Sequence, residues 1–202
     1  FITMNLLNEY ETPIISNVEN VSVSEDYSVT VSVSGLVDST KSISFTVQSS
    51  DLNILPLESS SLTGTGNQRE VLLTPLPDQN GDVVVSLIVQ DGDNSVTDVF
   101  TLTVEPVNDS PIIQNFVGTT VDEDIYRDSP LSLPFKVIDI DTSYDQVFVT
   151  SNSLNHALIG TNSMAIEGTQ SDKTLKVMTN PNQFGTVSIV VTVSDGEYTV
   201  TD

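Results

Sequence analysis

Residues 77–92 read PDQNGDVVVSLIVQDG, and this stretch decides the fold. Its apolar residues fall at every second position from Val83 to Val89, which is the spacing of a β-strand with one buried face. The strand is bounded by Pro77–Gly81 on one side and by Asp91-Gly92 on the other, and both stretches contain residue types that favour turns. The stretch therefore predicts a core strand between two turns.

Similar alternating runs occur along the whole chain, separated by clusters of Gly, Pro, Asn and Asp. The other predicted strands are residues 29–33, 42–47, 100–104, 148–150 and 187–193. No segment has the sustained 3.6-residue apolar period that an amphipathic helix would show. The chain is therefore predicted to be all-β.

The opening stretch also has a second copy. Residues 181–196 read PNQFGTVSIVVTVSDG, so Pro77 and Pro181 are 104 positions apart. Nearer the start of each copy, Pro13 and Pro111 are both followed by Ile-Ile and, twelve residues after the proline, by Glu-Asp. A period of this length matches one small β-sandwich domain. We therefore expect repeat 1 at residues 10–109 and repeat 2 at residues 110–202.

The two repeats end differently in this sequence. Repeat 1 runs from DGDNSVTD (91–98) into the predicted strand 100–104, whereas repeat 2 reaches only DGEYTVTD at residues 195–202. Residues 1–9, FITMNLLNE, look like the strand that repeat 2 lacks. Two explanations are open: residues 1–9 belong to a preceding repeat of a longer array, or they complete repeat 2 of another copy by donor-strand complementation. A missing strand leaves unpaired backbone groups, which favours rescue of this kind.

The charge balance excludes several classes of partner. The chain has 28 Asp and Glu against 6 Lys and Arg, a net charge of −22, so no nucleic acid and no anionic membrane surface is expected as a partner. No apolar run approaches the roughly 18 residues of a membrane span, and no membrane insertion is expected. Cations are the expected partners.

Acidic residues gather where loops are predicted, at the ends of the two sandwiches. They are Glu25-Asp26, Asp78, Asn108-Asp109, Glu123-Asp124, Asp139, Asp141 and Asp195. Calcium takes about six to eight oxygen ligands, and carboxylates from separate loops can supply them. In Asp139-Ile140-Asp141, the alternation of an extended segment predicts both carboxylates on one side and Ile140 in the core. The expected cofactor is Ca²⁺.

The ordered set Pro-Ile-Ile, Glu-Asp, Asp-x-Asp, Asp-Gly and a Phe-x-Leu-Thr-Val strand ending in Val-Asn-Asp-x-Pro resembles the bacterial cadherin-like tandem repeats of large surface adhesins. The resemblance covers nearly the whole chain. It implies tandem cadherin-like (Ig-like) Greek-key β-sandwiches with calcium between consecutive domains. The residues it implies as ligands at one joint are Glu25 and Asp78 from repeat 1, Asn108 and Asp109 from the linker, and Asp139, Asp141 and Asp195 from repeat 2. Repeat 1 departs from the pattern, because residues 34–40, SGLVDST, offer only Asp38 in the Asp-x-Asp position.

No catalytic residues are predicted, and the chain is not expected to be an enzyme. His156, the one histidine, lies in a polar Ser/Asn stretch, and no Gly-x-Ser-x-Gly motif accompanies the many serines. Asp139 and Asp141 lack the flanking aromatic residues of a sugar cleft, and the chain has no Trp.

The sequence therefore predicts an extracellular or cell-surface structural protein of a bacterium: a calcium-binding rod or filament of tandem repeats. Millimolar extracellular calcium suits weak sites of this kind. The expected partners are calcium and either further copies of the chain, as a homo-oligomer, or neighbouring repeats of one array. The alternative is an adhesin module that binds carbohydrate or a host surface ligand, for which Tyr126 and Tyr144 are scattered candidates.

Overall fold

The structure, a computed structural model, describes residues 12–36, 43–65, 68–92, 94–126 and 128–202. The predictions that concern residues 1–9, Asp38 and Ser42 lie outside the described residues. The chain divides into two units between Val107 and Asn108, and each unit has its own hydrophobic core. Apart from one 3-10 turn, η1 (Leu57–Ser59), the regular structure of the described residues is β-strand, which confirms the all-β prediction.

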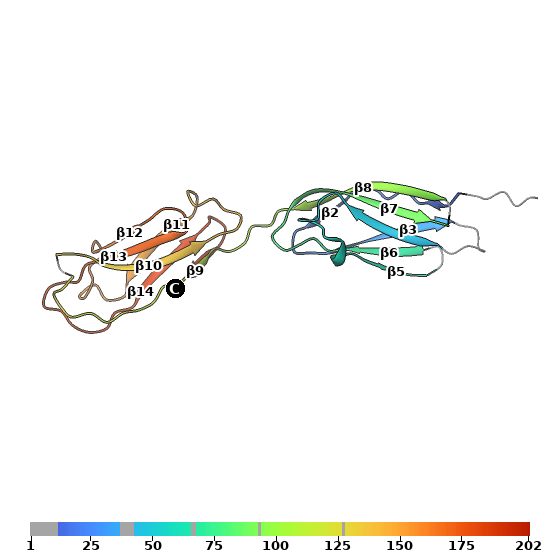
Figure 1. Ribbon diagram of the computed structural model, residues 1–202. Helices are drawn as coiled ribbons and strands as arrows, with labels where there is room; N and C mark the ends of the chain where they lie inside the picture. The colour runs from blue at the N-terminus through green and yellow to red at the C-terminus, as the bar shows by residue number, and fades with distance from the viewer. Residues whose placement is uncertain (1–11, 37–42, 66–67, 93, 127) are drawn as a thin grey trace, which may run out of the picture. The chain divides into compact units, whose positions relative to one another are not determined.

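Unit 1 is a sandwich of two sheets (Figure 1). One sheet has the order β1 (Ile14–Ile15), β3 (Val29–Leu36), β6 (Gln68–Leu73) and β5 (Ser61–Thr63). The other has the order β2 (Val21–Ser24), β8 (Ser95–Glu105), β7 (Gly81–Gln90) and β4 (Ser44–Ser49). The chain crosses between the sheets after β1, β2, β3, β4 and β6, and β2 pairs with β8 in parallel, as in an Ig-like Greek-key sandwich.

The core of unit 1 follows from the alternation of its strands. In β7, Val83, Val85, Leu87 and Val89 are buried, while the residues between them are half-buried or exposed. The opposite sheet contributes buried side chains from β3 and β6. Burial of each such side chain contributes roughly 1.5–3 kcal/mol, so the repeated alternation is what holds the two sheets together.

Unit 2 repeats this architecture with a shorter second sheet. Its first sheet has the order β12 (Met164–Glu167), β13 (Asp172–Val177), β10 (Leu131–Ile138) and β9 (Ile112–Gln114). Its second sheet has the order β11 (Phe148–Ser153), β14 (Ile189–Ser194) and β15 (Thr199–Thr201). The core contains Phe135, Val137, Ile159, Leu175, Val177, Val191 and Val193.

Backbone details recur between the units, as expected for two copies of one domain. Asp26 and Asp124 both have φ of 66°, and Gly81 and Gly185 have φ of 130° and 142°. Position 78 and its counterpart, Asn182, also lie in the left-handed region, with φ of 56° and 53°. Asp and Asn tolerate this conformation better than other residues with a side chain.

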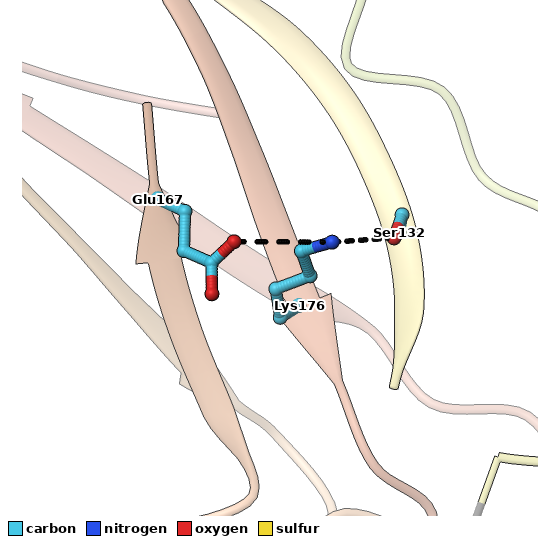
Figure 2. Close-up of polar contacts among 3 residues, drawn as sticks. All are labelled: Ser132, Glu167 and Lys176. Carbon is cyan, nitrogen blue, oxygen red and sulfur yellow. Dashed lines mark hydrogen bonds and ion pairs between the residues drawn. The ribbon is translucent and has the colours of Figure 1, made fainter. Parts of the chain in front are cut away.

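Two lysines of unit 2, Lys136 and Lys176, lie on the outer face of its first sheet. Lys176 is next to the buried Leu175 and Val177 in β13, so its side chain points the other way. Figure 2 shows its Nζ between Ser132 Oγ of β10, at 2.9 Å, and Glu167 Oε2 of β12, at 3.8 Å. Lys136 pairs with Asp172 at 3.1 Å on the same sheet. These two ammonium groups therefore pair with carboxylates other than the predicted metal ligands.

The second sheet of unit 2 corrects one predicted strand. We predicted a strand at residues 187–193, but β14 begins at Ile189. In unit 1 the equivalent residues, Val83 and Val84, pair with Leu102 and Thr101 of β8. The counterpart of β8, β15, ends at Thr201, and the described part of residues 115–130 contains no counterpart of β2. Among the residues that the structure describes, Val187 and Ser188 thus have no partner strand, and they are not part of β14.

Candidate metal centre

Asp139 begins the loop that follows β10, and the structure corrects our prediction for this segment. Asp139 Oδ1 accepts hydrogen bonds from the N–H groups of Asp141, at 3.1 Å, and Thr142, at 2.7 Å. This side-chain-to-backbone turn replaces the extended conformation that we assumed. Ile140 consequently points to solvent, with 57% of its surface exposed, and the prediction that it lies in the core is wrong.

The turn leaves one carboxylate oxygen of Asp139 in an unusual position. Asp139 Oδ2 is buried and has no hydrogen-bond partner among the residues that the structure describes. A buried charged oxygen without a donor is costly, because it has lost its contact with water and gained nothing in exchange. This oxygen is therefore suited to a cation ligand.

Asn108 and Asp109 join the same loop through backbone and amide groups. The N–H group of Asp109 donates to Asp141 Oδ2 at 2.8 Å. Asn108 Nδ2 donates to Asp195 Oδ2 at 2.9 Å, and Thr142 Oγ1 is 3.4 Å from Asn108 Oδ1, to which it donates. The amide of Asn108 thus lies between the loop after β10 and the loop after β14.

Asp195 is held in the ionised form. Its Oδ1 accepts from the N–H groups of Glu197, at 2.7 Å, and Tyr198, at 2.6 Å. Burial raises the pKa of Asp195, but the hydrogen bonds from Asn108, Tyr198 and Glu197 together outweigh burial, so the pKa lies below its ordinary value. The group is therefore a carboxylate at neutral pH.

The structure thus brings together the five predicted ligands that belong to unit 2: Asn108, Asp109, Asp139, Asp141 and Asp195. One hydrogen-bond network connects them. Four carry carboxylates, and carboxylates a few ångströms apart repel each other by about 1 kcal/mol per pair even at the dielectric constant of water. We call these five residues the unit 2 cluster.

Glu25 and Asp78, the two remaining predicted ligands, lie at one end of unit 1. Glu25 is completely buried, with 0% of its surface exposed. Its Oε1 accepts from the N–H group of Val107 at 2.6 Å, and its Oε2 accepts from Asn80 Nδ2 at 3.4 Å. Both donors are neutral amides, so these hydrogen bonds leave the charge of Glu25 without a cation.

Asp78 contacts a residue that our list of ligands omitted. The N–H group of Asp78 donates to Asp26 Oδ1 at 3.2 Å, and carboxylate oxygens of the two residues lie within 4.8 Å of each other. Both residues are exposed and have a left-handed backbone. The signal in the sequence was the Glu-Asp pair that follows Pro-Ile-Ile in both repeats. We call Glu25, Asp26 and Asp78 the unit 1 cluster.

The atoms that the two clusters offer to a cation are oxygen atoms of carboxylates and of the Asn108 amide. The neighbouring Thr142 adds a hydroxyl oxygen. This donor set suits a hard cation such as Ca²⁺, whereas the softer transition metals favour imidazole or thiolate ligands. Thr142 is a further member of the unit 2 network that we did not predict. Its signal was weak, because threonine hydroxyls are common in β-proteins and spacing alone does not single one out.

Comparisons with known proteins found solved structures of low similarity to this chain. No protein-family model matches the sequence, and no curated protein matches it. A crystal structure of the titin domains Z1Z2 in complex with telethonin has 15% identity and a TM-score of 0.40, over 96% of this chain and 94% of that chain. A three-Ig titin structure has 11% identity and a TM-score of 0.46, over 94% of this chain and 62% of that chain. An endo-fucoidan hydrolase of glycoside hydrolase family 107 has 15% identity and a TM-score of 0.41, with 94% of this chain matching 27% of the enzyme.

The described residues contain no helix that is long and apolar enough to cross a membrane.

Proposed function

We propose that this chain is a calcium-binding structural protein, a tandem β-sandwich that works outside the cell in the manner of the cadherin-like repeats it resembles. The observation that carries the proposal is Asp139 Oδ2, a buried carboxylate oxygen without a hydrogen-bond donor in a network of three further carboxylates. A bound divalent cation would satisfy this oxygen and reverse the repulsion between the carboxylates.

The buried Glu25 supports the same proposal from unit 1. A carboxylate that is removed from water and held by neutral amides costs several kcal/mol unless a cation compensates for it. Val107, whose N–H group Glu25 binds, directly precedes Asn108 in the chain. The two clusters are thus adjacent along the backbone, and the assignment of all seven predicted ligands to one joint stays a prediction.

The proposed role of calcium is mechanical. Without calcium, repulsion between carboxylates opposes the arrangement of the loops after β10 and β14. With calcium, the folded state gains RT ln(1 + [Ca²⁺]/Kd), which is about 2.7 kcal/mol at a hundredfold excess over Kd. Such a device suits millimolar extracellular calcium, and this argument supports a location at the cell surface.

The proposal extends to assembly. Copies of the chain would associate head to tail, with residues 1–9 of one copy completing unit 2 of another, and the resulting filament or rod would have adhesive or structural use rather than catalytic use. The dependence on calcium and the assembly are separate claims with separate tests.

The calcium claim is tested by thermal unfolding and by calorimetric titration with Ca²⁺. We expect the transition of unit 2 to rise by about 10 °C or more between excess EDTA and millimolar CaCl₂, since about 1 kcal/mol shifts the Tm of a domain of this size by roughly 4–8 °C. The double variant Asp139→Asn/Asp141→Asn should lose this rise. Asp172→Asn, which removes a carboxylate on the outer sheet face of the same unit, is the matched control and should keep it.

An equal Tm in EDTA and in CaCl₂, or a calcium effect that survives the double variant, would contradict the assignment.

A further inference from the structure

Residues 80 and 81 are the one Asn-Gly pair of the chain, and they stand where the turn of unit 1 enters the core strand β7. The fold needs glycine at position 81, because its φ of 130° is one that residues with a Cβ rarely adopt. Gly185, the equivalent in unit 2, has φ of 142°, but Phe184 precedes it. The turn therefore requires the glycine and does not require the asparagine.

Asn-Gly is the sequence in which an asparagine side chain reacts most readily with the backbone that follows it. The N atom of the next residue attacks Cγ of the asparagine, and glycine leaves this approach unobstructed because it has no Cβ. The attack closes a succinimide ring and releases ammonia, which carries away the proton of the attacking N–H group. Water then opens the ring.

The ring opens in either of two directions. Addition of water at Cγ breaks the new N–C bond and restores the normal backbone with an aspartate side chain. Addition at the backbone carbonyl breaks the original peptide bond, so the chain continues through Cβ and Cγ as isoaspartate. In both products ammonia has left and a water oxygen has entered, without oxidation or reduction. The residue thus gains a carboxylate in either case.

The structure leaves this pair accessible and weakly restrained. Asn80 is exposed and lies in the turn before β7, outside any strand. Gly81 forms the last pair of the β7–β8 ladder, with Val104, and β4 pairs with β7 only from Val85 onward. Ring closure needs rotation of the backbone between Asn80 and Gly81. This rotation disturbs the end of one ladder and not the centre of the sheet.

The side chain of Asn80 contacts a residue that makes the reaction matter. Its Nδ2 donates to Glu25 Oε2 at 3.4 Å, and the other oxygen of Glu25 accepts from the N–H group of Val107. Glu25 is completely buried, so water cannot screen its charge well. A carboxylate at position 80 has no proton to donate at neutral pH, and its charge would face that of Glu25. The reaction therefore turns an attractive contact into a repulsive one.

We propose that Asn80 is a site of spontaneous deamidation, and that its conversion weakens unit 1 by placing a second carboxylate beside the buried Glu25. The only co-reactant is water. The inference goes beyond the calcium-binding role and does not depend on it. Unit 2 is an internal reference, because it has Phe184 at the equivalent position and its Glu123 is exposed.

Peptide mass spectrometry after ageing in heavy-oxygen water tests the chemistry. In neutral buffer with EDTA, the folded chain should take up solvent oxygen at Asn80 well before it does so at its Asn-Ser pairs, which are also prone to this reaction. These pairs begin at Asn94, Asn152 and Asn162. Labelling with isoaspartyl methyltransferase should locate isoaspartate at position 80. Uptake at Asn80 no faster than at the Asn-Ser pairs, or uptake in urea only, would overturn the proposal.

The variant Asn80→Gln separates this reaction from other effects of ageing. It keeps an amide at the same position, but the ring that it would have to close is larger and forms much more slowly. After equal ageing in EDTA, the calorimetric transition of unit 1 should fall by several degrees in the parent chain and stay unchanged in the variant. An equal fall in both would show that deamidation at position 80 is not the cause.

Unaged variants test the coupling to Glu25. In EDTA, Asn80→Asp should lower the transition of unit 1 by several degrees. Gln79→Glu, which adds the same charge at the exposed neighbouring residue, is the matched control and should change it little. Glu25→Gln/Asn80→Asp should restore most of the loss, because the amide is then on the opposite side and can donate to the new carboxylate.

Two outcomes of these measurements would overturn the proposed effect on unit 1. One is a loss in Asn80→Asp that is equally large with and without Glu25→Gln, since the new carboxylate would then act independently of Glu25. The other is a parent chain that has converted at Asn80 and keeps its original transition. Because every measurement is made in EDTA, failure of the calcium test would leave these results unchanged, and failure here would leave the calcium claim unchanged.

Discussion

Glu25 and Glu123 are equivalent residues with different surroundings. Glu25 is completely buried and is held by the N–H group of Val107, while Glu123 is exposed. Removal of a carboxylate from water costs several kcal/mol, and two neutral donors recover only part of it. The fold of unit 1 therefore carries a charge that a cation would stabilise.

The substitution Glu25→Gln separates two effects of this buried charge: the loss of stability in unit 1 and the binding of calcium. In EDTA we expect no loss of Tm, because a neutral amide of similar shape is cheaper to bury than a carboxylate. In calcium we expect the variant to show a smaller rise in Tm than the parent chain. The measurement is differential scanning calorimetry under both conditions, and Glu123→Gln, at the exposed equivalent, is the control with little effect in either. A marked loss of stability in EDTA would show that Glu25 acts through its hydrogen bonds alone.

The left-handed backbone of Asp78 gives a second prediction at this scale. Unit 2 has Asn182 at the equivalent position with nearly the same φ, so Asp78→Asn should leave stability in EDTA within about 0.5 kcal/mol. Asp78→Val should cost about 1–2 kcal/mol or more, because a β-branched residue fits this conformation poorly. Urea unfolding of both variants checks the pair, and equal midpoints would contradict the argument.

Much of the candidate site could be predicted from the order of acidic residues along the chain. The five predicted ligands that belong to unit 2 lie in one network, because the loops after β10 and β14 leave the two sheets at the same end of the sandwich. The conformation of residues 139–141 could not be read from alternation, since the side chain of Asp139 competes for backbone N–H groups and turns the chain. Asp26 and Thr142 were not predicted as ligands, because their roles depend on contacts with residues distant in sequence.

At the scale of elements, strand positions followed from alternation and strand ends did not. Residues 83–89 and 100–104 were predicted, and the structure extends them to Gly81–Gln90 and Ser95–Glu105. The turn before β7 has an equivalent in the second repeat. However, β7 begins at Gly81, whereas β14 begins at Ile189 and not at the equivalent Gly185. A strand needs a partner as well as a pattern, and in unit 2 residues 185–188 have the pattern without the partner strand.

This difference predicts the hydrogen exchange of two equivalent segments. In unit 1 the amides of residues 81–85 lie in the first half of β7, which pairs with β8 along its whole length and with β4 from Val85 onward, and they should exchange slowly. In a chain without residues 1–8, the amides of residues 185–188 should exchange much faster. A synthetic peptide of residues 1–9 should then protect residues 185–188, while residues 81–85 serve as the internal reference. Equal protection in both segments before the peptide is added would contradict the open edge.

At the scale of the whole molecule, the two units are unequal versions of one design. Unit 1 has a core that β8 closes, whereas unit 2 has the same core with a groove of about 550 Å³. Two units with separate cores are expected to unfold in two transitions, and the open unit should have the lower one. The acidic clusters should widen this difference in stability, because the unit 2 cluster contains more carboxylates than the unit 1 cluster.

Completion of unit 2 should therefore stabilise it independently of calcium. In a chain without residues 1–8, appended residues VFTLTVE would bury a Phe, a Leu and a Val, and each contributes roughly 1.5–3 kcal/mol. Part of this gain is offset by the entropy of fixing seven residues, at about 1–2 kcal/mol each before their backbone hydrogen bonds are counted. We expect the lower calorimetric transition in EDTA to rise by several degrees and the upper one to stay unchanged. An appended segment with Asp in place of its Phe and Leu is the control, because it keeps the length and backbone donors but cannot enter the apolar groove. If both segments shift the lower transition equally, backbone pairing alone accounts for the stabilisation, and the apolar lining has no part in selecting the strand.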